Sequence, residues 1–217
     1  SVSVSTDTPT QGPRSAWPQG LSAFAVAYDY YKQAARPELS PHPFFGPTIL
    51  SSWPARVARK WARHEIGLAM EAEHENAIAA AAGHFIQAQR AATLALGEYE
   101  SHVNRFPFEQ ALFAPHIMIV SAYRSLAQAG GLRIEARQKL ASADTDDARE
   151  AAKVKLRRAL SLLDEADHAI RYYVSRTYRV DAFIHRRGDP YQQDRAPYEE
   201  LLRHIDNASE RIEASLD

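Results

Sequence analysis

The chain contains no cysteine among its 217 residues, and only nine glycines and two methionines. Without cysteine, a disulfide framework, a thiolate metal site and a cysteine nucleophile are all excluded. Scarce glycine and abundant alanine favour helices, because alanine is the best helix former and glycine one of the poorest. The sequence also shows no Ser/His/Asp elbow, no P-loop and no dinucleotide-binding glycine pattern, so these motifs support no enzyme class.

Long hydrophobic runs are also absent. The longest candidate, around Phe113 to Val120, contains Pro115 and His116 and is much shorter than a membrane span. The chain begins Ser-Val-Ser-Val-Ser-Thr, which lacks the charged and then apolar plan of a signal peptide. We therefore expect a soluble protein with no membrane partner.

The twelve prolines leave two long stretches free, from Pro54 to Pro107 and from Pro115 to Pro190. Apolar residues recur there at helical spacing, and no segment of useful length has the two-residue period of a strand. We predict an all-α protein with a four-helix-bundle core. The expected organisation is an N-terminal arm over 1–19, a bundle domain over 20–187 with a proline-rich loop at 37–50, and a C-terminal linker and helix over 188–217.

Glycine, proline and capping residues set the expected ends of the helices. A helix of some fifty residues should begin near Ser51 or Ser52 and break at Ala79–Gly83, and Gly130–Gly131 should interrupt the helix that follows. Pro115 should be tolerated there only with a kink or a late start. The predicted helices cover 21–35, 53–103, 108–128, 132–140, 146–186 and 197–215, with a polar turn from Ala141 to Thr145.

Positive charge is gathered in the centre of a chain whose net charge is −1. Between Arg124 and Arg158 there are nine Lys/Arg against five acids, or about +4. Arg149, Lys153 and Arg157 are spaced by four along one helix, and Arg133 and Arg137 repeat that spacing on the helix before it. Two basic helix faces joined by a short turn are able to bind the phosphates of a nucleic-acid strand. Lysine and arginine at this spacing are also common on ordinary solvent-exposed helix faces.

Two Glu-x-x-His motifs suggest a different chemistry. Ferritin-like di-iron bundles use two such pairs, because residues three apart point the same way into the core, together with single glutamates from other helices. An oxidase or oxygenase of that kind is the alternative function, and paired polar residues without a metal are the other reading of the motifs. The residues concerned are Glu71, His74, Glu135, Glu165 and His168.

Several short features, taken in order, resemble the coat proteins of rod-shaped, tobamovirus-type positive-strand RNA viruses. Ser15-Ala16-Trp17 precedes the first predicted helix, Arg105-Phe106-Pro107 opens the helix that leads towards RNA, and Asp146-Asp147-Ala148 starts the return helix. Tyr173, Arg176 and Tyr178 are similar to the aromatic and Arg-x-aromatic near the end of that helix. The islands cover about half of the chain, and residues 37–75 and those beyond Gly188 have no counterpart.

The resemblance implies a structural capsid subunit, not an enzyme, that assembles with copies of itself helically around single-stranded RNA. It further implies a location in the virion and, during assembly, in the host cytoplasm, with no cofactor. A plain helical interaction module is the remaining reading. We expect Arg133 and Arg137 to be exposed, so that replacing both with alanine weakens RNA packaging and leaves the fold intact. The residues expected at the RNA are Arg124, Arg133, Arg137, Asp146, Asp147, Arg149, Lys153 and Arg157.

Overall fold

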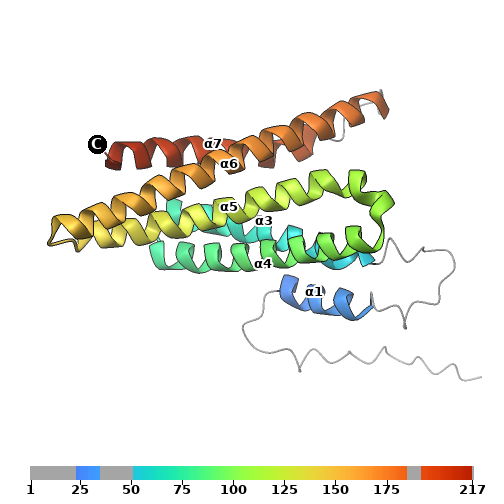
Figure 1. Ribbon diagram of the computed structural model, residues 1–217, viewed down its shortest axis with the longest axis horizontal. Helices are drawn as coiled ribbons and strands as arrows, with labels where there is room; N and C mark the ends of the chain where they lie inside the picture. The colour runs from blue at the N-terminus through green and yellow to red at the C-terminus, as the bar shows by residue number, and fades with distance from the viewer. Residues whose placement is uncertain (1–22, 35–50, 185–191, 217) are drawn as a thin grey trace, which may run out of the picture.

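The computed structural model describes residues 23–34, 51–184 and 192–216, and within these ranges it contains no strand. The prediction of an all-α protein is confirmed. Among these helices, none combines the length and the apolar composition that crossing a membrane requires. Figure 1 shows the elements, which are α1 (Ala23–Ala34), α3 (Trp53–His74), α4 (Ile78–Arg105), the short 3-10 helix η3 (Pro107–Glu109), α5 (Gln110–Ala141), α6 (Asp146–Ile184) and α7 (Gln192–Leu216).

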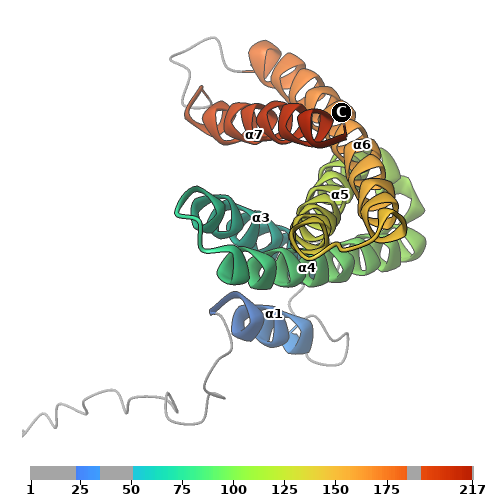
Figure 2. The ribbon, with the colours of Figure 1, turned by 90° about the vertical axis from the view of Figure 1, so that its left-hand side faces the viewer.

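Consecutive long helices pack on one another in chain order. Short connections turn α3 back along α4, α4 along α5, and α5 along α6, while α1 covers α3 and α7 lies against α6. No interface of similar extent joins α3 to α6, and Figure 2 shows α7 above α3, with α5 to one side of both. These contacts establish an antiparallel helical arrangement, and a closed four-helix bundle stays an expectation.

Alanine makes up much of the core, which lets the helices approach closely. Ala62, Ala69, Ala88 and Ala92 are fully buried, and they lie on α3 and α4, the pair with one of the two largest interfaces. A few large side chains fill the remaining space between the helices, because a core of methyl groups alone would leave voids. Those with almost no exposed surface include Ile66, Tyr99, Ile119, Tyr123, Leu156 and Ile170.

The break in the long N-terminal helical region lies at Asn76 and not at Ala79–Gly83, so that prediction was wrong. Asn76 has a φ of 59°, a left-handed conformation that asparagine tolerates better than most residues. The Ala77 N–H donates to the carbonyl of Ala72 at 2.7 Å, and the Asn76 N–H donates to that of Glu73 at 3.1 Å. These two bonds form a Schellman motif, which satisfies the last carbonyls of α3 before α4 begins.

Gly130 and Gly131 do not interrupt α5, which runs through both residues, and Pro115 also lies inside it. A Cβ atom on Gly130 would lie 2.5 Å from the ring of Phe85, whereas a Cβ on Gly131 would meet nothing within 4 Å. Phe85 belongs to α4 and is 2% exposed. Gly130 therefore serves the close approach of α4 and α5 and does not mark the end of a helix.

This contrast predicts opposite effects for two neighbouring substitutions. Gly130→Ala should lower the free energy of unfolding by about 1–3 kcal/mol, because the buried Phe85 ring has to shift. Gly131→Ala should raise it by about 0.5–1 kcal/mol, since alanine replaces glycine in a helix without a clash. Urea unfolding followed by circular dichroism measures both. Equal stability of the two variants would show that the Phe85 ring moves aside without loss of stability.

Candidate functional site

The predicted basic stripe on α6 is bound to groups of the same chain. Arg149 lies 3.2 Å from Asp146, and Arg157 lies 2.7 Å from Glu150. The Lys153 ammonium donates to the carbonyl of Leu216 at 2.7 Å, which ties α6 to the end of α7. Much of the positive charge on this helix is therefore balanced locally, which weakens the stripe as a phosphate site.

The predicted residues nearer the turn differ in their exposure. Arg137 is exposed near the end of α5, and Arg124 is only partly exposed further back on the same helix. Asp146 and Asp147 are exposed in the first turn of α6, where their charge suits the helix dipole. The structure thus places these residues along one pair of helices without gathering them at one point.

Arg133 is buried, so the expectation that it is exposed was wrong. The residue is 4% exposed, and one nitrogen of its guanidinium donates to both carboxylate oxygens of Glu73 on α3. Its position on α5 faces α3 and α7 and not solvent. Since Glu73 lies 60 residues away in the chain, helical spacing alone does not reveal the pair.

The buried guanidinium has one unsatisfied donor. Among the described residues, Arg133 Nε and the Tyr99 hydroxyl are the buried side-chain atoms without a hydrogen-bond partner. Burial lowers the pKa of Arg133, Glu73 opposes this shift, and the positive charges of Arg137 and Arg211 add to it. Arg133 Nε itself is buried, but a further anion nearby would meet the excess of positive charge that Arg137 and Arg211 contribute.

His204 of α7 lies beside this ion pair in its neutral form. Its Nε2 is 3.7 Å from a Glu73 oxygen. Burial, followed by the charges of Arg133 and Arg211, lowers the pKa of His204 to about 4. The Glu73 carboxylate would favour protonation, but it already binds Arg133, so burial and the two guanidinium groups prevail. Near pH 7 the imidazole is therefore an uncharged hydrogen-bonding group.

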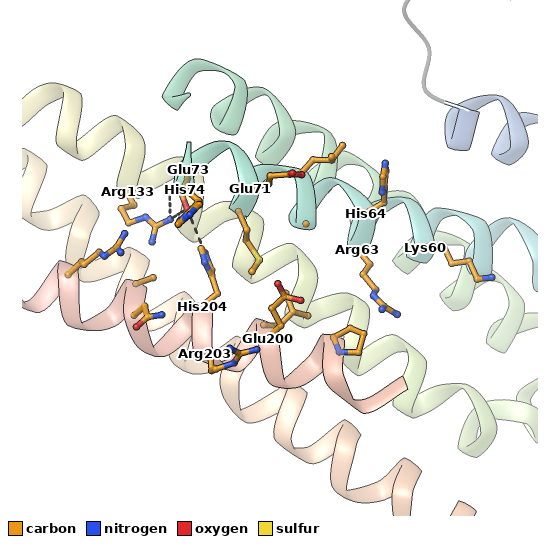
Figure 3. A pocket seen from close by; sticks show the side chains of 18 residues that line it. Lys60, Arg63, His64, Glu71, Glu73, His74, Arg133, Glu200, Arg203 and His204 are labelled. Carbon is orange, nitrogen blue, oxygen red and sulfur yellow. Dashed lines mark hydrogen bonds and ion pairs between the residues drawn. The ribbon is translucent and has the colours of Figure 1, made fainter. Parts of the chain in front are cut away.

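These residues belong to a groove of about 1280 Å³ that α3 and α7 line, with Arg133 of α5 between them. Figure 3 shows Glu73, His74, Arg133 and His204 gathered at one end and Lys60 and Arg63 towards the other. Arg63 also lies over the Tyr198 ring, 5.6 Å from its centroid. The groove carries five cations, Lys60, Arg63, Arg133, Arg203 and Arg211, against three carboxylates, Glu71, Glu73 and Glu200.

The residues of the alternative di-iron reading are not brought together. The side chains of Glu135, Glu165 and His168 are 56%, 53% and 79% exposed, whereas Glu71 and His74 line the groove. Within the described ranges, no group of three or more histidines and acids is placed to hold a metal ion. The spacing did put Glu165 and His168 on one face of α6, but that face points outward, while Leu162, Leu163 and Ala166 point inward.

Sequence reasoning missed most of the groove. Arg203, Asn207 and Arg211 are spaced by four on α7, and Lys60 and Arg63 share a face of α3. This spacing was a possible signal, but it is equally typical of solvated helix faces. Comparisons with family models, curated proteins and solved structures find no significant match to the chain.

Proposed function

We propose that the chain is a nucleic-acid-binding subunit that holds single-stranded RNA by its phosphates in the groove between α3 and α7. The observation that carries the proposal is the excess of cations over carboxylates in this groove. Glu73 is already bound to Arg133, so it does little to repel a phosphate. Phosphate contacts need no choice of base and rest on such a local positive zone, even in a chain of net charge −1.

The dimensions of the groove suit an extended ligand. Its volume of about 1280 Å³ exceeds the roughly 300–1,000 Å³ of ordinary small-molecule pockets. The positive charge also continues beyond it, because Arg137 acts electrostatically on Arg133 from the exposed end of α5. A strand in the groove would thus run towards the turn at Ala141–Thr145, where the resemblance to rod-shaped virus coat proteins puts the RNA.

Assembly of copies into a helical capsid around the RNA is the finer part of the proposal, and it implies location in a virion. Two large apolar side chains, Phe108 in η3 and Leu112 at the start of α5, are 78% and 65% exposed. Ile86 on α4 and Val154 on α6 are 64% and 56% exposed. Exposed apolar groups of this size are typical of surfaces that contact another molecule when they gather in patches. The proposed helical assembly, like the closed four-helix bundle, is supported mainly by the resemblance to rod-shaped virus coat proteins.

An RNA-binding titration with matched double variants tests the groove. Arg203 and Arg211 are exposed residues of α7 that line it, and Arg149 and Arg157 are exposed residues of the α6 stripe. Arg203→Ala with Arg211→Ala should weaken binding of a fluorescent oligouridylate roughly tenfold and lower the salt slope by about 1.4, or about 0.7 per lost phosphate contact. Arg149→Ala with Arg157→Ala removes the same charge and should change binding far less.

Two outcomes contradict the proposal that RNA binds in the groove. A larger loss in the α6 double variant would move the RNA to the stripe on that helix, and no binding by the folded wild type at low salt would end the proposal. Electron microscopy of the protein with RNA tests assembly separately. Absence of rods or discs over a range of pH would overturn the capsid part while leaving RNA binding to its own measurement.

A further inference from the structure

A serine, a histidine and a glutamate form a continuous hydrogen-bonded chain outside the groove. Ser51 Oγ lies 2.8 Å from His102 Nδ1, and His102 Nε2 lies 2.7 Å from Glu109 Oε2. Ser51 comes just before α3, His102 is in the last turn of α4, and Glu109 ends η3. The chain turns at Phe106 between α4 and η3, and this turn brings the acid back to the imidazole.

The imidazole is held in a fixed orientation. His102 is 2% exposed, and both of its ring nitrogens have side-chain partners. The rings of Phe113 and Phe106 pack against it, with centroids 4.5 and 5.1 Å away. A ring flip would put carbon atoms in the places of both nitrogens and break both hydrogen bonds, so the packing and the polar contacts favour one arrangement.

This arrangement gives the three groups distinct roles. In the neutral ring, Nε2–H donates to the Glu109 carboxylate, and the lone pair on Nδ1 accepts the Ser51 hydroxyl proton. A nucleophile bound to a base, with the base oriented by an acid, is the pattern that activates serine, and both distances lie within the required range of about 2.6–3.2 Å. Such sets are recognised by geometry and not by order in the chain.

We propose that Ser51 is a nucleophile, with His102 as its base and Glu109 as a positioning residue, that hydrolyses small esters with an apolar acyl group. Ser51 is only partly buried, whereas the neighbouring Ser52 is 1% exposed. The partly exposed side chain of Trp53, two residues along the chain, stacks on Tyr31 and adds an apolar surface to this end of α3. This activity is independent of the RNA groove.

The reaction needs no co-reactant except water. Ser51 Oγ attacks the ester carbonyl carbon while its proton passes to His102 Nδ1. The bond to the alkoxy oxygen then breaks, and that oxygen takes the proton from Nδ1 and leaves as an alcohol. A water molecule attacks the acyl-serine carbonyl and gives a proton to Nδ1. Loss of Ser51 Oγ, which takes this proton back, releases the carboxylic acid.

An alkyl fluorophosphonate probe on the full chain tests the proposal, with the modified residue located by mass spectrometry. We expect one adduct per chain on Ser51, none in Ser51→Ala, and an unchanged rate in Ser101→Ala, which alters an exposed serine beside His102. Because positioned bases contribute about 10²–10⁴-fold, His102→Gln should slow labelling at least 100-fold. Glu109→Gln should still bind Nε2–H, and it should slow labelling less and shift its pH profile.

Results opposite to these would overturn the proposal that Ser51 is a nucleophile. Circular dichroism establishes that each variant is folded, and Glu109→Gln covers the case in which replacing the buried His102 unfolds the chain. Absence of an adduct on Ser51 in the folded wild type would leave only a polar tie between α3 and the α4–η3 corner. Labelling of Ser51 at the same rate and with the same pH profile in folded Glu109→Gln would contradict the role of the acid. Hydrolysis of p-nitrophenyl acetate that persists in Ser51→Ala would place the activity elsewhere.

Discussion

Replacing Glu73 with alanine should lower the free energy of unfolding by about 3–5 kcal/mol, because it leaves a buried charge without its counter-ion. Arg133 is 4% exposed and binds both oxygens of Glu73. Burial already lowers its pKa, and Glu73 is the group that opposes this shift. Without Glu73, the nearby positive charge of Arg211 acts unopposed, so the cost of keeping the guanidinium charged rises. Chemical denaturation measures the loss directly.

Two further variants separate the ion pair from general damage to the core. Glu73→Leu combined with Arg133→Met should recover most of the stability, since a buried apolar pair often equals or exceeds a buried ion pair. Glu150→Ala breaks an exposed pair with Arg157, whose side chains are more than half exposed, and should cost less than about 1 kcal/mol. Wild-type stability in Glu73→Ala would contradict the role assigned to this pair.

The same pair changes how RNA-binding variants are to be read. Removal of Arg133 together with Arg137 is not a clean test of RNA packaging, because Arg133 is part of the core and its loss leaves Glu73 without its main partner. Arg203 and Arg211 are exposed and line the same groove, so their loss should report on binding with little effect on the fold.

Acidification from pH 6.5 towards pH 4 should destabilise the fold through His116 and His204. Burial and neighbouring arginines lower the pKa of both from 6.5 to about 4. The unfolded chain therefore takes up protons below pH 6.5 that the folded chain refuses, and stability is lost as the pH falls. At about 1.4 kcal/mol per pKa unit, each histidine contributes at most about 3 kcal/mol.

Contacts of His116 explain why it resists protonation. Its Nδ1 lies 2.6 Å from an Arg59 guanidinium nitrogen, and its ring stacks on Tyr99 at 6.0 Å between centroids. The guanidinium can only donate, so it holds the lone pair on Nδ1 that a proton would need. Protonation of His116 would break that hydrogen bond and place two positive charges side by side.

Urea unfolding at pH 7, 6 and 5 measures this dependence before most carboxylates titrate. His116→Gln and His204→Gln should each flatten the change in unfolding free energy over this range. His168→Gln is the control, because the His168 side chain is 79% exposed. An unchanged pH dependence in both core variants, or an equal change in the control, would contradict the assignment to buried histidines.

Features that depend on nearby residues could be predicted from the sequence. The all-α class followed from composition and apolar spacing, and the turn between α5 and α6 lies where polar residues precede Asp146. The helix break after α3 lies at Asn76 and not at the predicted Ala79–Gly83. It depends on the left-handed conformation of Asn76, whereas the prediction was based on residue composition. The predictions that fall on 1–22, 35–50 and 185–191 lie outside the described residues.

The sequence by itself determined that this protein is helical, lacks cysteine chemistry, and carries positive charge along its central helices. Only the tertiary structure decided that Gly130 faces Phe85, that Arg133 is buried against Glu73, and that α3 and α7 form a groove. It also decided that Ser51, His102 and Glu109 meet. The physical reason is that helical spacing fixes which residues share a face, while the packing of distant helices decides what that face meets.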